Sequence, residues 1–357
     1  MNTTVSTLLS LLRMSLDPGK VEDDCNAPDS GSLVHLAYHQ EVAALICDPV
    51  QLLYESGCDV LDDKQAKLRL FRQKLIQEKH YEANLKTMHK LSDLFESDDI
   101  VMYVLKGASI SQYYPNPQYR YSCDMDCILA YKNNNGFESR YEEGNRLLEN
   151  KGVKVTRDYY KHAEFSVNGL YVENHKFCCS IKRGERTKKL ETYLQSLLHP
   201  DSAEKVNGLY FPPLMFQAIF MIEHACSHFL YEKISLKHIC DWAMFRKANI
   251  DKLDWVEFKK QCDEFRLWNF VEALSNLADV ILGVKTYDDL SALEKRILDD
   301  TLQVVKYVDS KKERRFRKAL GVLSSSWKYK NYGHSSMLQE LSTAFFAYLF
   351  EKDPKLA

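Results

Sequence analysis

The sequence predicts an α+β fold in which a small mixed β-sheet is flanked by N-terminal helices and by a C-terminal helical domain. Apolar residues follow a helical period before residue 96 and again after residue 186. Between these positions the pattern changes to short β-prone runs separated by turn signals. We therefore divide the chain into an N-terminal helical segment at 1–95, an α/β core at 96–186 and a C-terminal helical domain at 187–357.

Length, charge and cysteine content limit the class of protein. The 357 residues are too many for one small core, and a net charge of −2 provides no overall attraction to nucleic acid or an anionic membrane. No stretch approaches 18 consecutive apolar residues, so we expect no membrane span and no membrane partner. The ten cysteines are scattered and include no Cys-x-x-Cys pair, which predicts reduced thiols and a cytoplasmic location.

The N-terminal segment is expected to be helical. Residues 1–16 contain a leucine cluster too short to span a bilayer and are predicted to form an amphipathic helix that packs on the body. Residues 17–32 are polar and loop-like. Residues 62–95 are predicted to form one long helix or two.

The core is expected to run strand, helix, strand, helix, strand and hairpin. The dipeptide Asn168-Gly169 between two β-prone runs is a strong two-residue hairpin signal. The predicted strands are 100–105, 122–130, 153–156, 164–167 and 170–179, and the predicted helices are 108–114 and 137–150.

The C-terminal domain is expected to contain only helices. Pro212-Pro213 begins a helix that runs to residue 231, because proline is favoured at a helix start. Further helices are predicted near 235–247, 254–264, 266–283, 289–305 and 336–350.

Two aspartates on the second main strand are the centre of the predicted site. In a strand, alternate residues share a face, so Asp124 and Asp126 point one way while Met125 and Cys127 point the other. Two carboxylates so close repel each other unless a cation neutralises them, which makes the pair a candidate Mg²⁺ clamp. The alternative is a solvent-facing strand edge with two solubilising acids.

Two further segments strengthen the prediction. Lys106, Gly107 and Ser109 lie where a strand turns into a helix, a place at which backbone can approach a phosphate. Glu173 shares a face of the later strand with His175, and can act there as a base or as a further metal ligand. The alternative for Gly107 is a glycine that only the turn requires, and the alternative for Glu173 is an exposed acid on a strand.

These motifs, in this order, resemble the uncharacterised bacterial nucleotidyltransferase family of the DNA polymerase β-like superfamily. The resemblance rests on Leu105-Lys106-Gly107, Tyr114-Pro115, Arg120 before Asp124-x-Asp126, and Glu173-Asn174-His175. Glu223-His224 through His228 and then Asp241 are similar to later elements of the family. The resemblance extends over residues 65–260.

The resemblance implies transfer of a nucleoside monophosphate from a nucleoside triphosphate such as ATP to an acceptor. Asp124 and Asp126 would bind Mg²⁺ or Mn²⁺, and Glu173 would be the third carboxylate. Lys106 and Arg120 would neutralise the triphosphate, as catalysis of this type depends on positioning and electrostatics. The acceptor is open: a small molecule, a saccharide, a protein or RNA.

Several residues have both a functional and a structural interpretation. Arg120 either contacts phosphate or forms an ion pair with Asp124 or Asp126. His224 and His228 share a helix face and either line an acceptor pocket with His175 and Asp241, hold zinc, or pack structurally. The basic run 311–318 and the aromatic and basic segment 327–332 either contact RNA or form solvated helix faces.

Three functions compete. The first is an active nucleotidyltransferase. The second is a catalytically inactive protein of the same fold that binds a nucleotide or a partner. The third is a zinc hydrolase centred on His224 and His228, although Ala225 stands where a metalloprotease motif requires glutamate.

Overall fold

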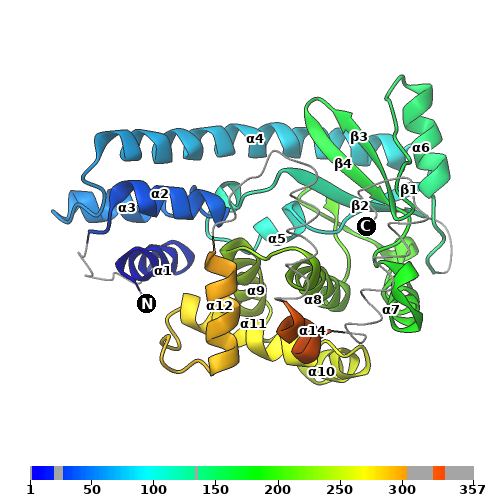
Figure 1. The fold of residues 1–357 in the computed structure, drawn as a ribbon. Coiled ribbons are helices and arrows are strands. Elements are labelled where there is room, and N and C mark those ends of the chain that lie inside the picture. Colours follow the sequence, from blue (N-terminus) through cyan, green and yellow to red (C-terminus); the bar gives the residue numbers. More distant parts are fainter. Residues whose placement is uncertain (1, 20–26, 133–135, 304–324, 334–357) are drawn as a thin grey trace, which may run out of the picture.

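In the computed structural model, which describes residues 2–19, 27–132, 136–303 and 325–333, the sheet lies at one end of the molecule and the N-terminal helices at the other (Figure 1). This arrangement confirms the α+β prediction. The N-terminal helices are α1 (Thr3–Leu16), α2 (Ser30–His39), α3 (Cys47–Glu55) and α4 (Lys64–Glu96).

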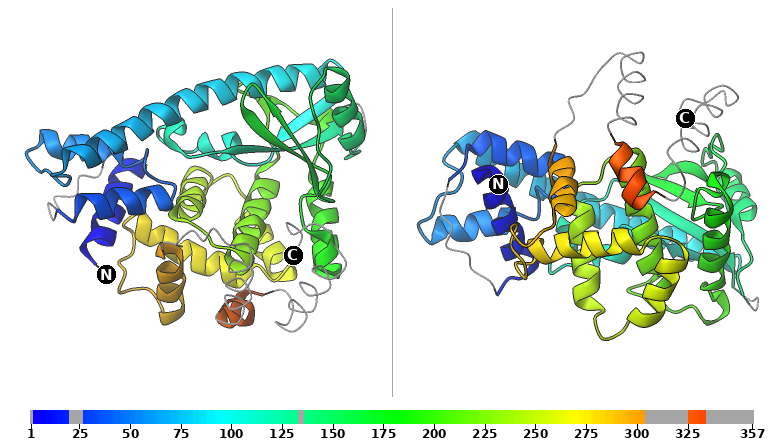
Figure 2. Two further views of the ribbon diagram at one scale, coloured as in Figure 1. Left: turned by 45° about the horizontal axis from the view of Figure 1, so that its top comes forward. Right: turned by 60° about the horizontal axis from the view of Figure 1, so that its bottom comes forward.

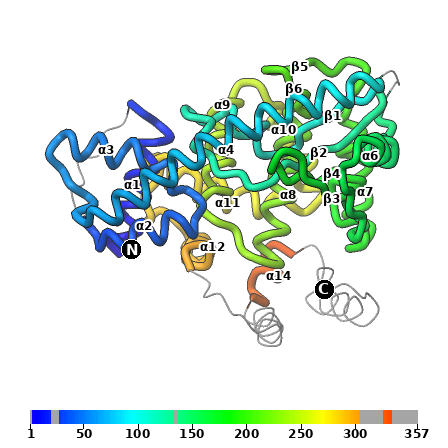
Figure 3. Tube along the Cα trace, turned by 90° about the horizontal axis from the view of Figure 1, so that it is seen from above, coloured from blue at the N-terminus to red at the C-terminus, as the bar shows by residue number. Residues whose placement is uncertain are grey.

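Helix α4 connects the two ends. It is a single helix of 33 residues whose first turn is capped by Asp63, which accepts a hydrogen bond from the Gln65 amide. Figure 3 shows it running from the N-terminal helices to the sheet, where its last turns pack on β1. Residues 62–95 therefore form one helix rather than two.

The sheet has six strands in the order β3-β4-β2-β1-β6-β5. Strand β2 is antiparallel to β1 and parallel to β4, β3 and β4 form an antiparallel hairpin, and β6 is parallel to β1. The strands are β1 (Ile100–Val104), β2 (Asp124–Tyr131), β3 (His162–Val167), β4 (Leu170–His175), β5 (Lys205–Val206) and β6 (Leu209–Tyr210).

The two faces of the sheet pack against different helices. One face carries Met125, Cys127 and Leu129 and forms a hydrophobic cluster with α4 and with α6 (Tyr141–Asn150). The other face contributes Ile128 and Ala130 to the large cluster that contains the C-terminal helices. The face opposite α4 and α6 is therefore the one on which the even-numbered residues of β2 lie.

The C-terminal helices lie along one side of the molecule in both views of Figure 2. Pro213 precedes the first residue of α8, as predicted, and Ser291 caps α12 in a capping box with Glu294. The helices are α7 (Glu185–Ser196), α8 (Leu214–Tyr231), α9 (Leu236–Ala248), α10 (Trp255–Glu264), α11 (Trp268–Ile281), α12 (Ala292–Leu302) and α14 (Ser326–Tyr332). The predicted helix at 336–350 and the basic run at 311–318 lie outside the described residues.

Several predicted elements of the core differ from the structure: strand β3 begins at His162 rather than at 164, and strand β4 ends at His175 rather than at 179. Helix α6 begins at Tyr141 rather than near 137, because Ser139 first forms a bridge with Ala130. The expected strand at 153–156 is reduced to one bridge between Thr156 and Glu164. Helix α5 (Ala108–Ser111) is shorter than predicted.

The C-terminal segment, predicted to be wholly helical, also supplies two strands. The strands β5 and β6 form an antiparallel hairpin at the edge of the sheet, where Tyr210 pairs with Tyr103 of β1. The sheet is thus completed by residues beyond 186.

Two further findings concern the general class of protein. Among the described helices, none combines the length and apolar character needed to cross a bilayer. Cys58 is disulfide-bonded, which corrects the expectation of uniformly reduced thiols. Eight other cysteines are free: Cys47, Cys123, Cys127, Cys178, Cys179, Cys226, Cys240 and Cys262.

Candidate functional site

The two aspartates of β2 occupy the predicted positions. Asp124 and Asp126 both line a cleft on the face of the sheet opposite α4 and α6, while the odd-numbered residues between and beyond them are buried beneath those helices. Asp126 is almost completely buried, at 1% exposure, and Asp124 is partly exposed. The alternation expected for a strand is therefore confirmed, and the aspartates are not on a solvent-facing edge.

The neighbouring strands bring an acid and two histidines to the same place. Because β4 is parallel to β2, Glu173 pairs with Asp126. Because β3 and β4 form a tight hairpin, His162 pairs with His175. All of these side chains line the same cleft.

The Asp126 carboxylate lies between a histidine and a lysine. Its Oδ1 is 2.7 Å from Nε2 of His175, and its Oδ2 is 2.9 Å from Nζ of Lys106. The ammonium of Lys106 is also 3.4 Å from Nε2 of His224 on α8. Burial lowers the pKa of Lys106, and the negative charges of Asp124 and Glu173 oppose this. A positive group therefore already lies against the buried aspartate.

Gly107 allows this approach of the lysine. Its φ of 72° lies in the left-handed region, and a Cβ atom there would be 3.1 Å from Oγ of Ser122 and 3.6 Å from the carbonyl oxygen of Asp124. The preceding Leu105 amide donates a hydrogen bond to the Asp126 carbonyl at 2.9 Å. Close packing of the turn against the start of β2 thus explains the glycine and places Lys106 beside Asp126.

Glu173 lies close to both histidines. Its Oε2 is 3.3 Å from Nδ1 of His162 and 3.5 Å from Nε2 of His175. Burial opposes ionisation of Glu173, but the hydrogen bond from His175 and neighbouring positive charge keep its pKa below the usual value. Burial also keeps the pKa of His162 and His175 below their usual value. The environment of the cluster therefore favours the ionised form of the carboxylate, while burial favours the neutral form of each ring.

The cleft has a volume of about 730 Å³. Its walls come from the sheet, from the loops around 158–161 and 178–183, and from α8. Besides Lys106, it presents two further basic residues, Lys161 and Arg183. His224 and His228, predicted to line an acceptor pocket, do lie in its wall. Acidic residues outnumber these three bases in the lining, so the cleft favours a cation, or an anionic ligand that carries one.

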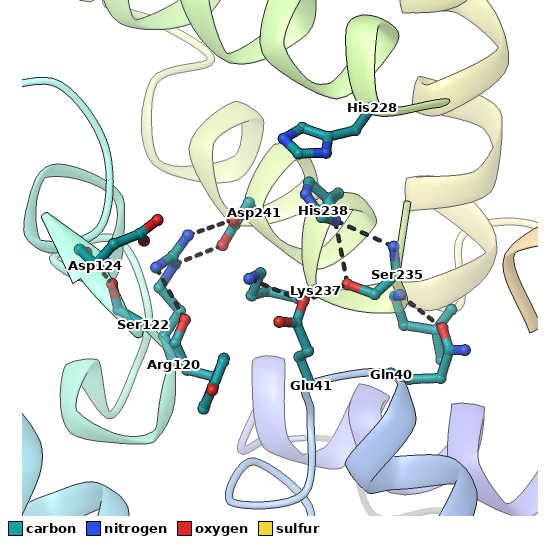
Figure 4. A network of polar contacts seen from close by, with 12 residues as sticks. Gln40, Glu41, Arg120, Ser122, Asp124, His228, Ser235, Lys237, His238 and Asp241 are labelled. Atoms are coloured by element: carbon teal, nitrogen blue, oxygen red, sulfur yellow. Dashed lines mark hydrogen bonds and ion pairs between the residues drawn. The ribbon is translucent and has the colours of Figure 1, made fainter. Parts of the chain in front are cut away.

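Arg120 and Asp124 line a smaller adjacent cavity, and Figure 4 shows the polar contacts of Arg120. Its Nε and Nη2 donate hydrogen bonds to the Asp241 carboxylate at 2.9 and 2.7 Å, and the Tyr114 hydroxyl donates a third at 2.7 Å. Burial opposes ionisation of Asp241, but Arg120 holds the pKa of that carboxyl below its usual range. Arg120 thus forms an ion pair, with Asp241 rather than with Asp124 or Asp126, and contact with phosphate stays a prediction.

In the part of the chain that the structure describes, the paired histidines of α8 belong to no group of three possible metal ligands. The rings of His224 and His228 are 4.4 Å apart, but Nε2 of His224 contacts the Lys106 ammonium at 3.4 Å. His228 instead contacts Glu232 at 3.0 Å. Among the described residues, the group that brings three possible ligand atoms within 4.8 Å of one another is His162, Glu173 and His175. This does not support a zinc hydrolase centred on α8.

The structure adds residues to the predicted site and leaves one outside it. His162, Lys161 and Arg183 line the main cleft but were not predicted, and Lys237 and His238 line the smaller cavity. Ser109, predicted to contact phosphate, is fully buried and lines neither cavity. His162 lies close to His175 because the two-residue turn at Asn168-Gly169 fixes the register of β3 and β4.

Comparison with known proteins identifies a family. A family model described as an uncharacterised nucleotidyltransferase matches residues 26–283, a range that contains every residue of the predicted site. No curated protein and no solved structure matches the chain.

Proposed function

Because the chain belongs to this uncharacterised nucleotidyltransferase family, we propose that it is a metal-dependent enzyme that transfers a nucleoside monophosphate from a nucleoside triphosphate to an acceptor. The observation that carries the proposal is the placement of Asp124, Asp126 and Glu173 on adjacent strands of one cleft. The same proposal places the family in the DNA polymerase β-like superfamily and the protein in the bacterial cytoplasm.

The donor atoms fit a hard divalent cation. Mg²⁺ prefers carboxylate oxygens, and Asp124 and Asp126 present theirs to the same cleft. The Asp124 carboxylate makes no hydrogen bond or ion pair with any side chain in the described part of the chain. Asp124 and Asp126 would therefore hold Mg²⁺ or Mn²⁺, with Glu173 as the third carboxylate. The chemistry that such an ion would supply there is positive charge to offset the negative charge that develops on the phosphates.

The protein's own groups would position the reactants. In the reaction, an acceptor oxygen forms a bond to the α-phosphorus, the bond to the bridging oxygen of the pyrophosphate breaks, and the acceptor loses a proton. Lys106, Lys161 and Arg183 line the cleft and would bind the anionic phosphates. His224 and His228 on the opposite wall would face the acceptor. Exclusion of water by the buried floor at Asp126 would strengthen these interactions.

The experiment is isothermal titration calorimetry of the full chain with each of the four ribonucleoside triphosphates, with and without Mg²⁺. We expect Mg²⁺-dependent binding of at least one nucleotide, and its loss in the Asp124→Asn, Asp126→Asn double variant. Asp158→Asn is the matched control, since this acid lines the same cleft but belongs to none of the strands that carry the three acids. Pyrophosphate release should then identify acceptors.

Two outcomes would contradict the proposal. Nucleotide binding that survives the double substitution would place the site elsewhere. Tight Mg²⁺-dependent binding without pyrophosphate release for any acceptor class would instead favour the inactive nucleotide-binding or partner-binding module.

A further inference from the structure

We propose that His162, Glu173 and His175 form a binding site for a transition-metal dication such as Zn²⁺, distinct from the Mg²⁺ site at the aspartates. It requires no nucleotide and goes beyond the proposed function, although Glu173 is common to both. The three residues are the described group whose ligand atoms lie within 4.8 Å of one another.

The separations match the edges of a coordination shell. Oε2 of Glu173 is 3.3 Å from Nδ1 of His162 and 3.5 Å from Nε2 of His175. Ligands about 2.0–2.1 Å from a tetrahedral ion are roughly 3.3–3.4 Å from one another. Charge-assisted hydrogen bonds between such groups are shorter, at about 2.7–2.9 Å. The two contacts of Glu173 are longer than such bonds and have the spacing of ligands around one ion, whereas the contact of His175 with Asp126, at 2.7 Å, is a direct bond.

The far nitrogen of each ring has an oxygen acceptor. Nε2 of His162 is 3.4 Å from Oε1 of Glu164, and Nδ1 of His175 is 3.1 Å from the carbonyl oxygen of Phe177. Histidines that bind metals commonly donate their second N–H to a carboxylate or carbonyl in this way, which directs the other lone pair at the ion. Nδ1 of His162 consequently faces Glu173, and Nε2 of His175 lies between Glu173 and Oδ1 of Asp126.

Nδ1 of His162 is not used in any hydrogen bond of the described residues, although it is buried. A buried nitrogen without a partner costs free energy, and a bound ion would remove that cost. The ring lies 5.2 Å from that of His175, at an interplanar angle of 61°, so both rings border the same space.

The backbone holds the ligands before the ion arrives. His162 and His175 are a directly paired couple of the β3–β4 hairpin, and Glu173 lies two residues earlier on β4. Ligands on paired strands are held more firmly than ligands on loops. The group also lines the open cleft of about 730 Å³, which gives an ion a route in.

The donor set selects the kind of ion. Imidazole nitrogens suit zinc, iron, nickel and copper, whereas Mg²⁺ favours oxygen ligands. Two histidines and a glutamate also form catalytic zinc sites that keep a fourth position open. Oδ1 of Asp126 is 2.7 Å from Nε2 of His175, closer than two ligands of one ion would lie, so it borders the group rather than completing the shell.

The test is equilibrium dialysis of the full chain, stripped with EDTA, against Zn²⁺ in excess Mg²⁺ and without nucleotide. Co²⁺ absorption in the visible range reports the geometry. We expect one Zn²⁺ per chain, with binding weakened at least tenfold by His162→Gln and by His175→Gln. His228→Gln is the control, since this histidine lines the same cleft outside the group.

Circular dichroism shows whether each variant is folded. If the His175 variant does not fold, the result is taken from the His162 variant, because His162 is less buried than His175. Wild-type affinity in a folded His162→Gln protein, or loss of zinc in His228→Gln alone, would overturn the proposal. A folded wild-type protein that binds neither Zn²⁺ nor Co²⁺ would also overturn it. Failure of nucleotide binding with zinc retained would count only against the proposed function.

Discussion

At the scale of single residues, Lys106 occupies the place that a cation would take beside Asp126. Its ammonium is 2.9 Å from a carboxylate that is almost completely buried. A buried carboxylate without a positive neighbour is costly, so this ion pair stabilises the cleft while no metal is bound. If the aspartates bind a divalent ion as proposed, that ion would neutralise the same charge as the lysine.

Lys106→Met should therefore make the protein depend on metal for its stability. We expect the free energy of unfolding to fall by about 1–3 kcal/mol without metal, because a buried carboxylate loses its partner. Mg²⁺ should then raise the melting temperature of the variant more than that of the wild type. Lys161→Met, which lines the same cleft, is the control for lost surface charge. Equal shifts in variant and wild type would contradict this role of Lys106.

Asp241 has a structural role that can be tested by pH. Its carboxylate accepts two hydrogen bonds from Arg120 and one from Tyr114, all of them buried. Asp241→Asn leaves the guanidinium without its counter-charge, and we expect a loss of about 3–5 kcal/mol at pH 7 in urea unfolding. Asp263→Asn, in an exposed pair with Lys259, should cost less than about 1 kcal/mol.

The pH dependence follows from the direction of the pKa shift. The pKa of Asp241 is lower in the folded chain than its usual value, because Arg120 outweighs burial. Its stabilisation is therefore complete above the usual value, near 3.9, and is lost as the pH falls through the folded-state pKa. The difference between wild type and Asp241→Asn should shrink only below about pH 4. A difference that already shrinks between pH 7 and 5 would contradict this assignment.

The sequence reveals the acids of the site but misses one histidine. Alternation along β2 is enough to place Asp124 and Asp126 on one face. His162 was missed because β3 was predicted to begin at Glu164. Yet a two-residue turn at Asn168-Gly169 pairs each earlier residue of β3 with a later one of β4, so His175 must meet His162 once the strand is long enough. The partner of Arg120 lies 121 residues away, and no local pattern identifies it.

At the scale of elements, the turn from β1 into α5 determines how the cleft is assembled. Gly107→Ala should lower the free energy of unfolding by about 1–3 kcal/mol, since its φ of 72° strains any other residue. We also expect weaker Mg²⁺-dependent nucleotide binding, because Ser122 and the start of β2 must move away from the new methyl group.

Gly152→Ala is a matched control for this prediction. Gly152 has a φ of 81°, but a Cβ atom there would meet nothing within 4 Å. The Gly152→Ala variant should have a lower free energy of unfolding in urea because of backbone strain, while its nucleotide affinity should equal that of the wild type. Equal nucleotide affinity in both variants would show that the close packing at Gly107 has no part in binding.

The elements that were missed share a physical cause. Strands β5 and β6 contain two residues each, too few to show a period of two. The sequence nevertheless contains the signal Asn207-Gly208, the same dipeptide that predicted the β3–β4 hairpin, and both residues have positive φ. Pairing with β1 stabilises these short strands, and only the tertiary structure supplies that contact.

At the scale of the whole molecule, the N-terminal helices are tied to the helix that borders the smaller cavity. The hydrophobic cluster that includes α1 also includes residues of α8, α9 and α11. Glu41 forms an ion pair with Lys237 at 2.8 Å and accepts a hydrogen bond from the Ser235 hydroxyl, as Figure 4 shows. Because α9 also carries His238 and Asp241, the N-terminal segment supports the position of the site.

Gln40 makes the most extensive of these links, and its removal tests the coupling. Its side chain accepts a hydrogen bond from the Leu236 amide at 2.9 Å and donates one to the Thr301 carbonyl at 2.9 Å, and both bonds are buried. Gln40→Ala leaves two buried backbone groups unpaired, at a cost of about 1–3 kcal/mol each. We expect urea unfolding to show that loss, and nucleotide affinity to fall because the start of α9 is released.

The control for this prediction is Gln51→Ala, whose amide bonds only to the exposed Glu55 one turn later. Its free energy of unfolding should change by less than about 0.5 kcal/mol. If Gln40→Ala lowers stability while nucleotide affinity stays unchanged, the N-terminal helices support the fold but not the site. If neither changes, the buried amide is replaced by water, and the coupling between the N-terminal segment and α9 rests on Glu41 and the hydrophobic cluster.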